Sequence, residues 1–185
     1  MVLSLISHVV NGVKGGVSAA LKGTVDVASD VVRVTKETTV SVLKETGEAT
    51  KATLDVPASL VKGAFDGAAE VGVSTIDAVK GIVSGTIQGL MDSGYDKDMA
   101  VKGTVAQSLH SAKALGLNVA ETATETVNGV VDGVKQVGGD TMGATKTAIE
   151  AALETAADIG GDAVKEVKEA LSAGVKGAKE IMDAM

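Results

Sequence analysis

Large apolar residues recur at every eleventh position of this chain, and this period limits what the chain can fold into more than any other feature. The series begins at Val10, is interrupted at Asp98 and then resumes in the same phase. We call its large members the apolar stripe: Val10, Leu21, Val32, Leu43, Leu54, Phe65, Ile76, Ile87, Leu109, Val131, Met142, Leu153, Val164 and Val175. Eleven residues make three turns of a slightly underwound α-helix, so the stripe predicts helices that are apolar along one side.

The same period distinguishes between kinds of helix packing. Apolar residues follow one another by steps of four, three and four positions, as in Ile6, Val10, Val13, Val17 and Leu21. Strict alternation of apolar and polar residues does not persist, which argues against strands. A hendecad (eleven-residue) seam predicts a straight or slightly right-handed supercoil. We therefore predict an all-α fold of long amphipathic hendecad helices that pack into a coiled-coil assembly.

A cluster of turn-forming residues lies near the middle of the chain. Residues 92–98 contain Gly94 and several aspartates, and the stripe lacks a large residue at Asp98. Such clusters between periodic segments are typical of turns. We expect a helical hairpin, with a first helical arm at residues 1–91, a turn at 92–98 and a second arm at 99–185.

Each arm also contains one weaker break. Pro57 lacks a backbone N–H, so we expect the first arm to kink or restart near residues 55–57. Two glycines followed by an aspartate predict a joint in the second arm near residues 138–140. Four helical segments are therefore the alternative description of the chain.

The two borders of the stripe differ in composition. One border is rich in lysines, whose stems can lie along the apolar strip while their ammonium groups stay in water. These bordering lysines are Lys14, Lys36, Lys80, Lys102, Lys113, Lys135, Lys146, Lys168 and Lys179. The other border consists of small residues, which would let another helix backbone approach closely: Gly12, Gly23, Gly67, Gly89, Gly133 and Gly177, with Ala78, Ala100 and Ala144.

The composition indicates thin seams between helices instead of a thick core. The chain has one Phe, one Tyr and no Trp, whereas aromatic residues bury the largest areas in most cores. It also has 23 glycines, each of which costs about 0.5–1 kcal/mol relative to Ala inside a helix. We infer that the helices form only in contact with another surface.

Several function classes are disfavoured by the sequence. A net charge of −7 argues against nucleic acid as a partner, and the absence of Cys excludes disulfides and thiolate metal sites. The two histidines, His8 and His110, belong to no ligand cluster, and no phosphate-binding glycine motif or nucleophile elbow is present. We expect no enzymatic activity, no catalytic residue, no metal, no cofactor and no small-molecule substrate.

No segment of the sequence is expected to cross a membrane. The longest stretch without a charged residue is Met1–Val13, which is shorter than the roughly 20 apolar residues that a span requires. That stretch lacks a basic n-region and an evident cleavage site, so it does not read as a signal peptide. We expect a cytoplasmic or peripheral protein, and the compartment stays open.

The repeats resemble those of known amphipathic-helix families. Segments such as Val34-Thr35-Lys36-Glu37 and the recurrent Val-Lys-Gly at residues 61–63, 79–81 and 101–103 combine small apolar faces, Thr, Gly and bordering Lys. In this periodicity nearly the whole chain resembles synuclein-type and perilipin-type repeats and is similar to late-embryogenesis-abundant proteins. The resemblance implies helices that form on a surface.

Three hypotheses for function follow. The first is a non-enzymatic structural protein that self-assembles laterally through its hendecad helices into a coiled coil, barrel, sheet or filament, because a wide stripe with two unlike borders suits neighbours on both sides. The alternative is a peripheral binder that coats a membrane, droplet or storage granule. The second alternative is a stress-protective, conditionally disordered protein. The sequence leaves the oligomeric state, the helix orientation and the lipid class open.

Overall fold

The computed structural model describes residues 2–22, 27–46 and 55–185. Within these residues the chain forms nine α-helices and no β-strand, so the predicted all-α class is confirmed. The helices are α1 (Val2–Leu21), α2 (Val27–Thr46), α3 (Asp55–Val71), α4 (Thr75–Asp92), α5 (Lys97–Ala114), α6 (Val119–Gln136), α7 (Thr141–Ile159), α8 (Ala163–Gly174) and α9 (Ala178–Asp183).

The two long arms expected from the sequence are divided into shorter helices, the longest of which have 20 residues. Breaks lie between α4 and α5, before α3 and between α6 and α7, where the sequence analysis placed a turn, a restart and a joint. Further breaks follow α3, α5, α7 and α8, where no break was expected. The chain therefore folds as a series of short helices in place of a hairpin of two rods.

The physical reason for the breaks after α3, α5 and α7 is a boundary signal that recurs every 22 residues. Helices α4 to α8 begin at residues 75, 97, 119, 141 and 163. The residue before each is a favourable N-cap type, and in the first four the side chain accepts a backbone N–H three residues later: Ser74, Asp96, Asn118, Asp140 and Asp162. Two residues before each cap lies a glycine with positive φ: Gly72, Gly94, Gly116, Gly138 and Gly160.

These glycines end the helices because only glycine adopts a left-handed conformation without a steric penalty. After α5, for example, Gly116 has a φ of 70° and the Leu117 N–H donates to the Ala112 carbonyl at 2.8 Å. This hydrogen bond closes the last turn as in a Schellman motif. The structural unit is thus one helix with its loop, and it comprises two eleven-residue periods.

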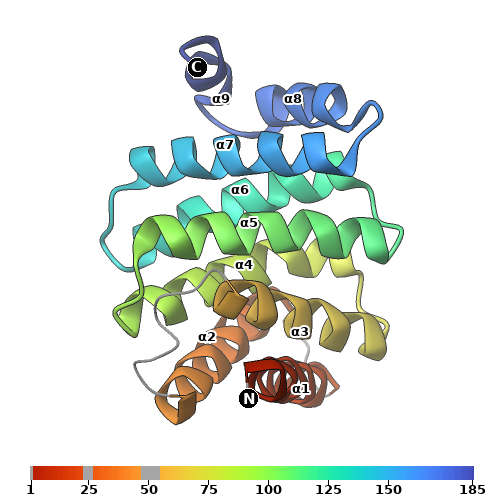
Figure 1. Cartoon of the computed structure of the whole chain (residues 1–185), viewed down its shortest axis with the longest axis vertical. Helices are drawn as coiled ribbons and strands as arrows, with labels where there is room; N and C mark the ends of the chain where they lie inside the picture. Colours follow the sequence, from red (N-terminus) through yellow and green to blue (C-terminus); the bar gives the residue numbers. More distant parts are fainter. Residues whose placement is uncertain (1, 23–26, 47–54) are drawn as a thin grey trace.

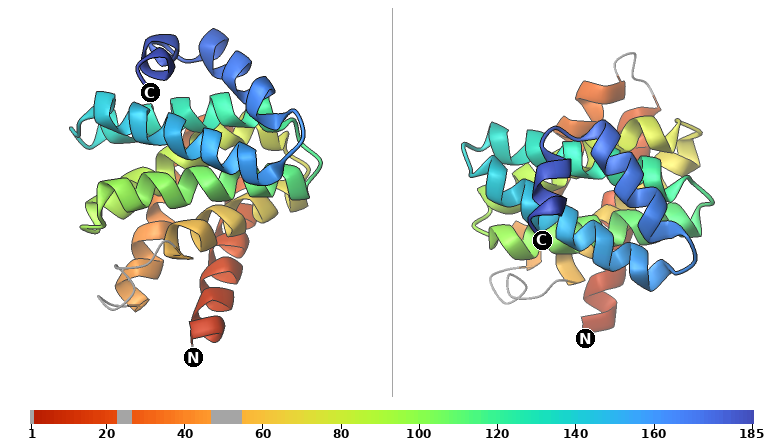
Figure 2. Two further views of the ribbon diagram at one scale, coloured as in Figure 1. Left: turned by 45° about the horizontal axis from the view of Figure 1, so that its top comes forward. Right: turned by 90° about the horizontal axis from the view of Figure 1, so that it is seen from above.

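The helices form two layers (Figure 1). Helices α1, α3, α5 and α7 stack in one layer, and α2, α4, α6 and α8 stack in the other, so most helices contact both the next helix and the next but one. The stack runs from α1 and α2 at one end to α8 and α9 at the other, where α9 packs against α7 and α8 (Figure 2). This arrangement is an α-solenoid, in which contacts are confined to units that are close along the chain, here the next helix and the next but one.

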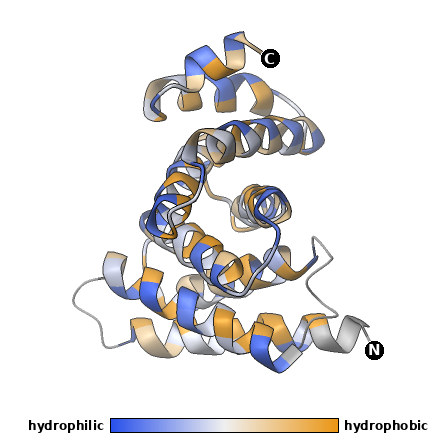
Figure 3. Cartoon of the chain, turned by 90° about the vertical axis from the view of Figure 1, so that its left-hand side faces the viewer, coloured by the Kyte–Doolittle hydropathy of each residue, from blue (hydrophilic) through white to orange (hydrophobic). Residues whose placement is uncertain are grey.

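The core lies between and within the layers. Polar and apolar residues alternate around the helices, as expected for amphipathic helices that bury one side (Figure 3). Buried residues from both layers form one continuous cluster, in which Phe65, Ile82, Ile87 and Leu109 are fully buried. Val and Ala supply most of the other buried positions, in agreement with the thin seams expected from the composition.

Candidate functional surfaces

The apolar stripe is used mostly inside the chain. Members spaced by 22 residues are buried core residues: Leu21 and Leu43 are 5% and 3% exposed, and Phe65, Ile87 and Leu109 are fully buried. Val175 is also buried, whereas Met142 is 78% exposed. The remaining described members are half-buried: Val10, Val32, Ile76, Val131, Leu153 and Val164. Leu54 lies outside the described residues.

The alternation of buried and half-buried stripe residues has a simple cause. In α4, α7 and α8 the second residue of the helix is a stripe member, namely Ile76, Met142 or Val164, and it lies close to a loop. In α4 the counterpart eleven residues later, Ile87, lies deep in the helix, where the neighbouring helices cover it. In α7 the counterpart, Leu153, is half-buried, and Val175 lies just beyond the end of α8. The stripe therefore mainly joins helices of the same chain.

Several bordering lysines connect helices of one layer. Lys14 of α1 pairs with Glu70 of α3 at 3.1 Å, and Lys36 of α2 pairs with Asp92 of α4 at 2.8 Å. In addition, Lys113 donates to the Ile159 carbonyl at 3.2 Å. Since the paired side chains of Lys14 and Lys36 are more than a third exposed, each bridge contributes at most about 1 kcal/mol.

Lys80 of α4 forms a third bridge between helices, to Asp132 of α6 at 2.8 Å. The remaining bordering lysines form no bridge to another helix among the described ion pairs. Lys146 pairs with Glu150 of its own helix at 3.8 Å. The others are exposed: Lys102, Lys135, Lys168 and Lys179.

Three glycines of the predicted small-residue border, Gly67, Gly89 and Gly133, lie against another helix of the same chain, whereas a Cβ added to Gly12 or Gly177 would meet nothing within 4 Å. Other glycines make equally close contacts. A Cβ added to Gly63 of α3 would lie 2.5 Å from the Val10 carbonyl oxygen of α1. A Cβ added to Gly85 of α4 would lie 2.5 Å from the Val32 carbonyl oxygen of α2. In α6, Gly129 lies against α4 in the same way. Glycine therefore lets alternate helices pack almost backbone to backbone.

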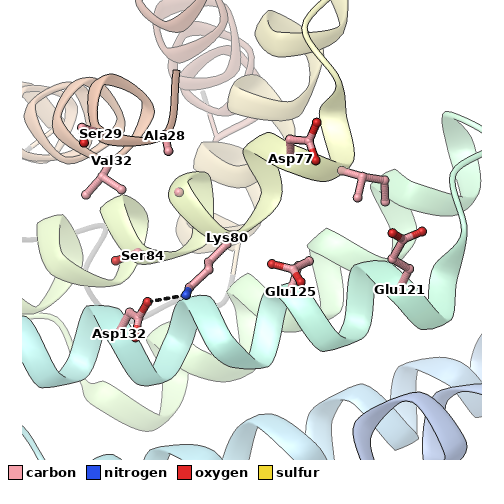
Figure 4. A pocket seen from close by; sticks show the side chains of 11 residues that line it. Ala28, Ser29, Val32, Asp77, Lys80, Ser84, Glu121, Glu125 and Asp132 are labelled. Carbon is pink, nitrogen blue, oxygen red and sulfur yellow. Dashed lines mark ion pairs between the residues drawn. The ribbon is translucent and has the colours of Figure 1, made fainter. Parts of the chain in front are cut away.

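An open groove of about 480 Å³ lies where α2, α4 and α6 meet (Figure 4). Four carboxylates line it, but only one lysine does, and that lysine is Lys80, which is already paired with Asp132. Half-buried apolar side chains from α2 and α4 complete the lining. The lining residues are Ala28, Ser29, Val32, Ile76, Asp77, Lys80, Gly81, Ser84, Glu121, Glu125 and Asp132.

The sequence analysis did not identify this groove. One signal was present, because Asp77 and Asp132 each directly follow a stripe residue, Ile76 or Val131. Their proximity depends on α4 packing against α6, the next helix but one, and an eleven-residue period does not specify that contact. The groove is therefore a product of the layered packing.

The described part of the chain offers neither a cluster of metal ligands nor a helix suited to cross a membrane. Residues 2–22, 27–46 and 55–185 contain no group of three or more His, Asp or Glu side chains that could hold a metal ion. Both His8 and His110 are exposed. Among the helices described, none combines the length and apolar character needed to cross a bilayer.

Comparisons with known proteins do not assign the chain to a family. No family model matches it, and no curated protein matches it.

Proposed function

We propose that the protein is a non-enzymatic structural protein that self-assembles, and that copies associate through the outer face of α1. This face is defined by the exposed residues among positions 6–21 of α1: Ser7, His8, Asn11, Gly12, Gly15 and Ala19. The observation that carries the proposal is the difference between this face and the end formed by α8 and α9.

The end formed by α8 and α9 has a charged surface. Lys165, Glu166, Lys168 and Glu169 of α8 are exposed, and α9 packs across this end with further charged residues on its outside. Repeat proteins need such polar capping units, because an end unit has no neighbour to cover its outer side. A charged outer face therefore favours contact with water at this end.

The outer face of α1 is different because it carries no charged residue and is rich in glycine. A Cβ added to Gly12 or Gly15 would meet nothing within 4 Å, so these positions lie against open space. The glycines of α3, α4 and α6 lie instead against another helix. By analogy with these contacts, the outer face of α1 suits a closely approaching helix, and the same face of a second copy would give an isologous pair.

Sedimentation velocity over a range of protein concentrations tests this proposal. We expect the wild-type chain to associate as concentration rises and the Gly12→Glu variant to remain monomeric, because a charge would be placed in the contact. Ser172→Glu adds the same charge to the exposed surface of α8 and should leave association unchanged. A wild-type chain that stays monomeric throughout, or two variants that associate equally, would contradict the proposal.

Circular dichroism with and without liposomes separates this proposal from the two alternatives. Stripe residues such as Leu43 and Phe65 are buried between helices, so lipid contact through the stripe would require the helices to separate. We expect high helicity in buffer and no change on addition of anionic liposomes. A rise in helicity with liposomes would favour the lipid-coating alternative, and a coil spectrum that becomes helical only on drying would favour the stress-protective one.

A further inference from the structure

We infer that the groove between α2, α4 and α6 binds a short basic peptide segment of another protein, with lysine or arginine side chains over its acidic rim and an aliphatic side chain on its apolar floor. The inference does not depend on self-association, because the groove lies on the layer of even-numbered helices whereas α1 belongs to the other layer.

The rim has an excess of negative charge. Three of its carboxylates, Glu121, Glu125 and Asp132, lie on one face of α6, because steps of four and seven residues return to the same side of a helix. They extend over roughly 16 Å along the helix axis. Asp77 lines the groove from α4 (Figure 4). The single lysine, Lys80, is bound to Asp132 at 2.8 Å, so the remaining carboxylates favour a cationic ligand.

Apolar side chains also line the groove on the side of α2 and α4, and we call them its floor; they are a separate observation from the carboxylates, which we call its rim. Val32 of α2 and Ile76 of α4 are only half-buried, with Ala28 and Gly81 beside them. A polyamine has methylene groups between its cations but no aliphatic side chain that could cover both Val32 and Ile76, whereas a peptide can present lysines and branched aliphatic side chains together. The combination of acidic rim and apolar floor therefore selects a basic peptide with apolar residues.

The size and openness of the site also fit a peptide. A volume of about 480 Å³ is sufficient for several side chains, and the groove is open to solvent. An extended segment of roughly five residues spans the row of carboxylates on α6, since each extended residue covers about 3.3 Å. Because the carboxylates are at the surface, we expect binding to weaken with added salt.

Fluorescence anisotropy with a labelled octapeptide of alternating Lys and Leu tests the inference. The matched probes are a Glu-Leu octapeptide, a Lys-Ser octapeptide and spermine. We expect the Lys-Leu peptide to bind at least about fivefold more tightly than each of the other three, which corresponds to about 1 kcal/mol. No saturable binding of the Lys-Leu peptide, or equal binding of the Lys-Ser peptide, would overturn the inference.

Two double variants localise the binding. Glu121→Gln with Glu125→Gln removes two charges from the rim, and we expect the Lys-Leu peptide to bind at least about fivefold more weakly. Glu166→Gln with Glu180→Gln removes the same charge from exposed positions on α8 and α9 and should leave binding unchanged. Equal loss in both variants would overturn the inference, because it would indicate general attraction to an acidic protein. Far-UV circular dichroism verifies that both variants are folded.

Discussion

The first three helices and the five that follow reach the same packing by different means. The starts of α4 to α8 are spaced by 22 residues, and each start directly follows an N-cap residue that lies two residues after a left-handed glycine. The starts of α1, α2 and α3, at residues 2, 27 and 55, do not keep this spacing. Yet α1 packs on α3, and α2 on α4, through the same glycine contacts and lysine bridges. The layered packing therefore does not require equal spacing of the helices along the chain.

The two regions specify their helices by different interactions. In the regular part, local signals at each loop define where a helix ends, so the boundaries depend little on distant residues. The starts of α1, α2 and α3 keep no such spacing, so there the contacts between alternate helices carry more of the specification, although glycines of α6 make the same kind of contact with α4. Substitutions at a loop signal and substitutions at a contact between helices should therefore each disturb one of these interactions and leave the other intact.

The largest effect is expected from Gly85→Ala, with Gly15→Ala as its matched control. A Cβ at Gly85 would lie 2.5 Å from the Val32 carbonyl oxygen and 2.9 Å from the Thr35 Cβ, so α2 and α4 would have to separate. We expect the free energy of unfolding to fall by about 1–3 kcal/mol. At Gly15 an added Cβ meets nothing within 4 Å, and the better helix propensity of Ala should raise stability by up to about 1 kcal/mol. Urea denaturation at low protein concentration measures both, and effects of the same sign would contradict the close contact.

A smaller effect is expected at the local boundary signal of α5. The Asp96 carboxylate accepts the Met99 N–H at 2.9 Å, and Asp96→Ala removes this cap. We expect a loss of about 1 kcal/mol in thermal or urea unfolding. Asp96→Asn should restore most of that stability, because Asn118 caps α6 in the same way. An equal loss in both variants would show that charge, and not the cap, determines the effect.

The smallest effect is expected from the lysine bridges. A double-mutant cycle on Lys36 and Asp92, with each replaced by Ala, should give a coupling energy below about 1 kcal/mol that decreases with added salt. The same cycle on Lys165 and Glu169, which are 4.0 Å apart on the exposed surface of α8, is the control and should give coupling close to zero. Equal coupling in the two cycles would mean that bridges between helices add nothing specific.

The sequence predicted the helical class and the presence of a close helix contact at glycine, but not the repeat unit. The stripe looks the same in both halves of each unit, which suggested continuous helices. The 22-residue signal lies at other positions, where Val61, Val83 and Val105 alternate with Gly72 and Gly94. Residues of good N-cap type follow two positions after these glycines, as at Ser74 and Asp96. The alternation of Val and Gly between successive hendecads at this position therefore marks the loops.

The eleven-residue period does not determine which helices become neighbours. An eleven-residue period indicates which side of a helix is buried, but not which helix covers it. That α4 contacts α6, and so brings Asp77 toward Glu125, depends on the direction of two loops and on the layered stack. The groove therefore could not be predicted from the stripe alone, although each of its residues is visible in the sequence.

The alternation of helices between two layers restricts how such a chain can change in length. Loss or gain of one 22-residue unit would move every later helix into the opposite layer, so that α6 would take a place built for an odd-numbered helix. Loss or gain of two units, 44 residues, would return each later helix to its own layer and its own partners. Internal duplications and deletions in a molecule of this kind should therefore survive in pairs, and its natural increment of growth is two helices.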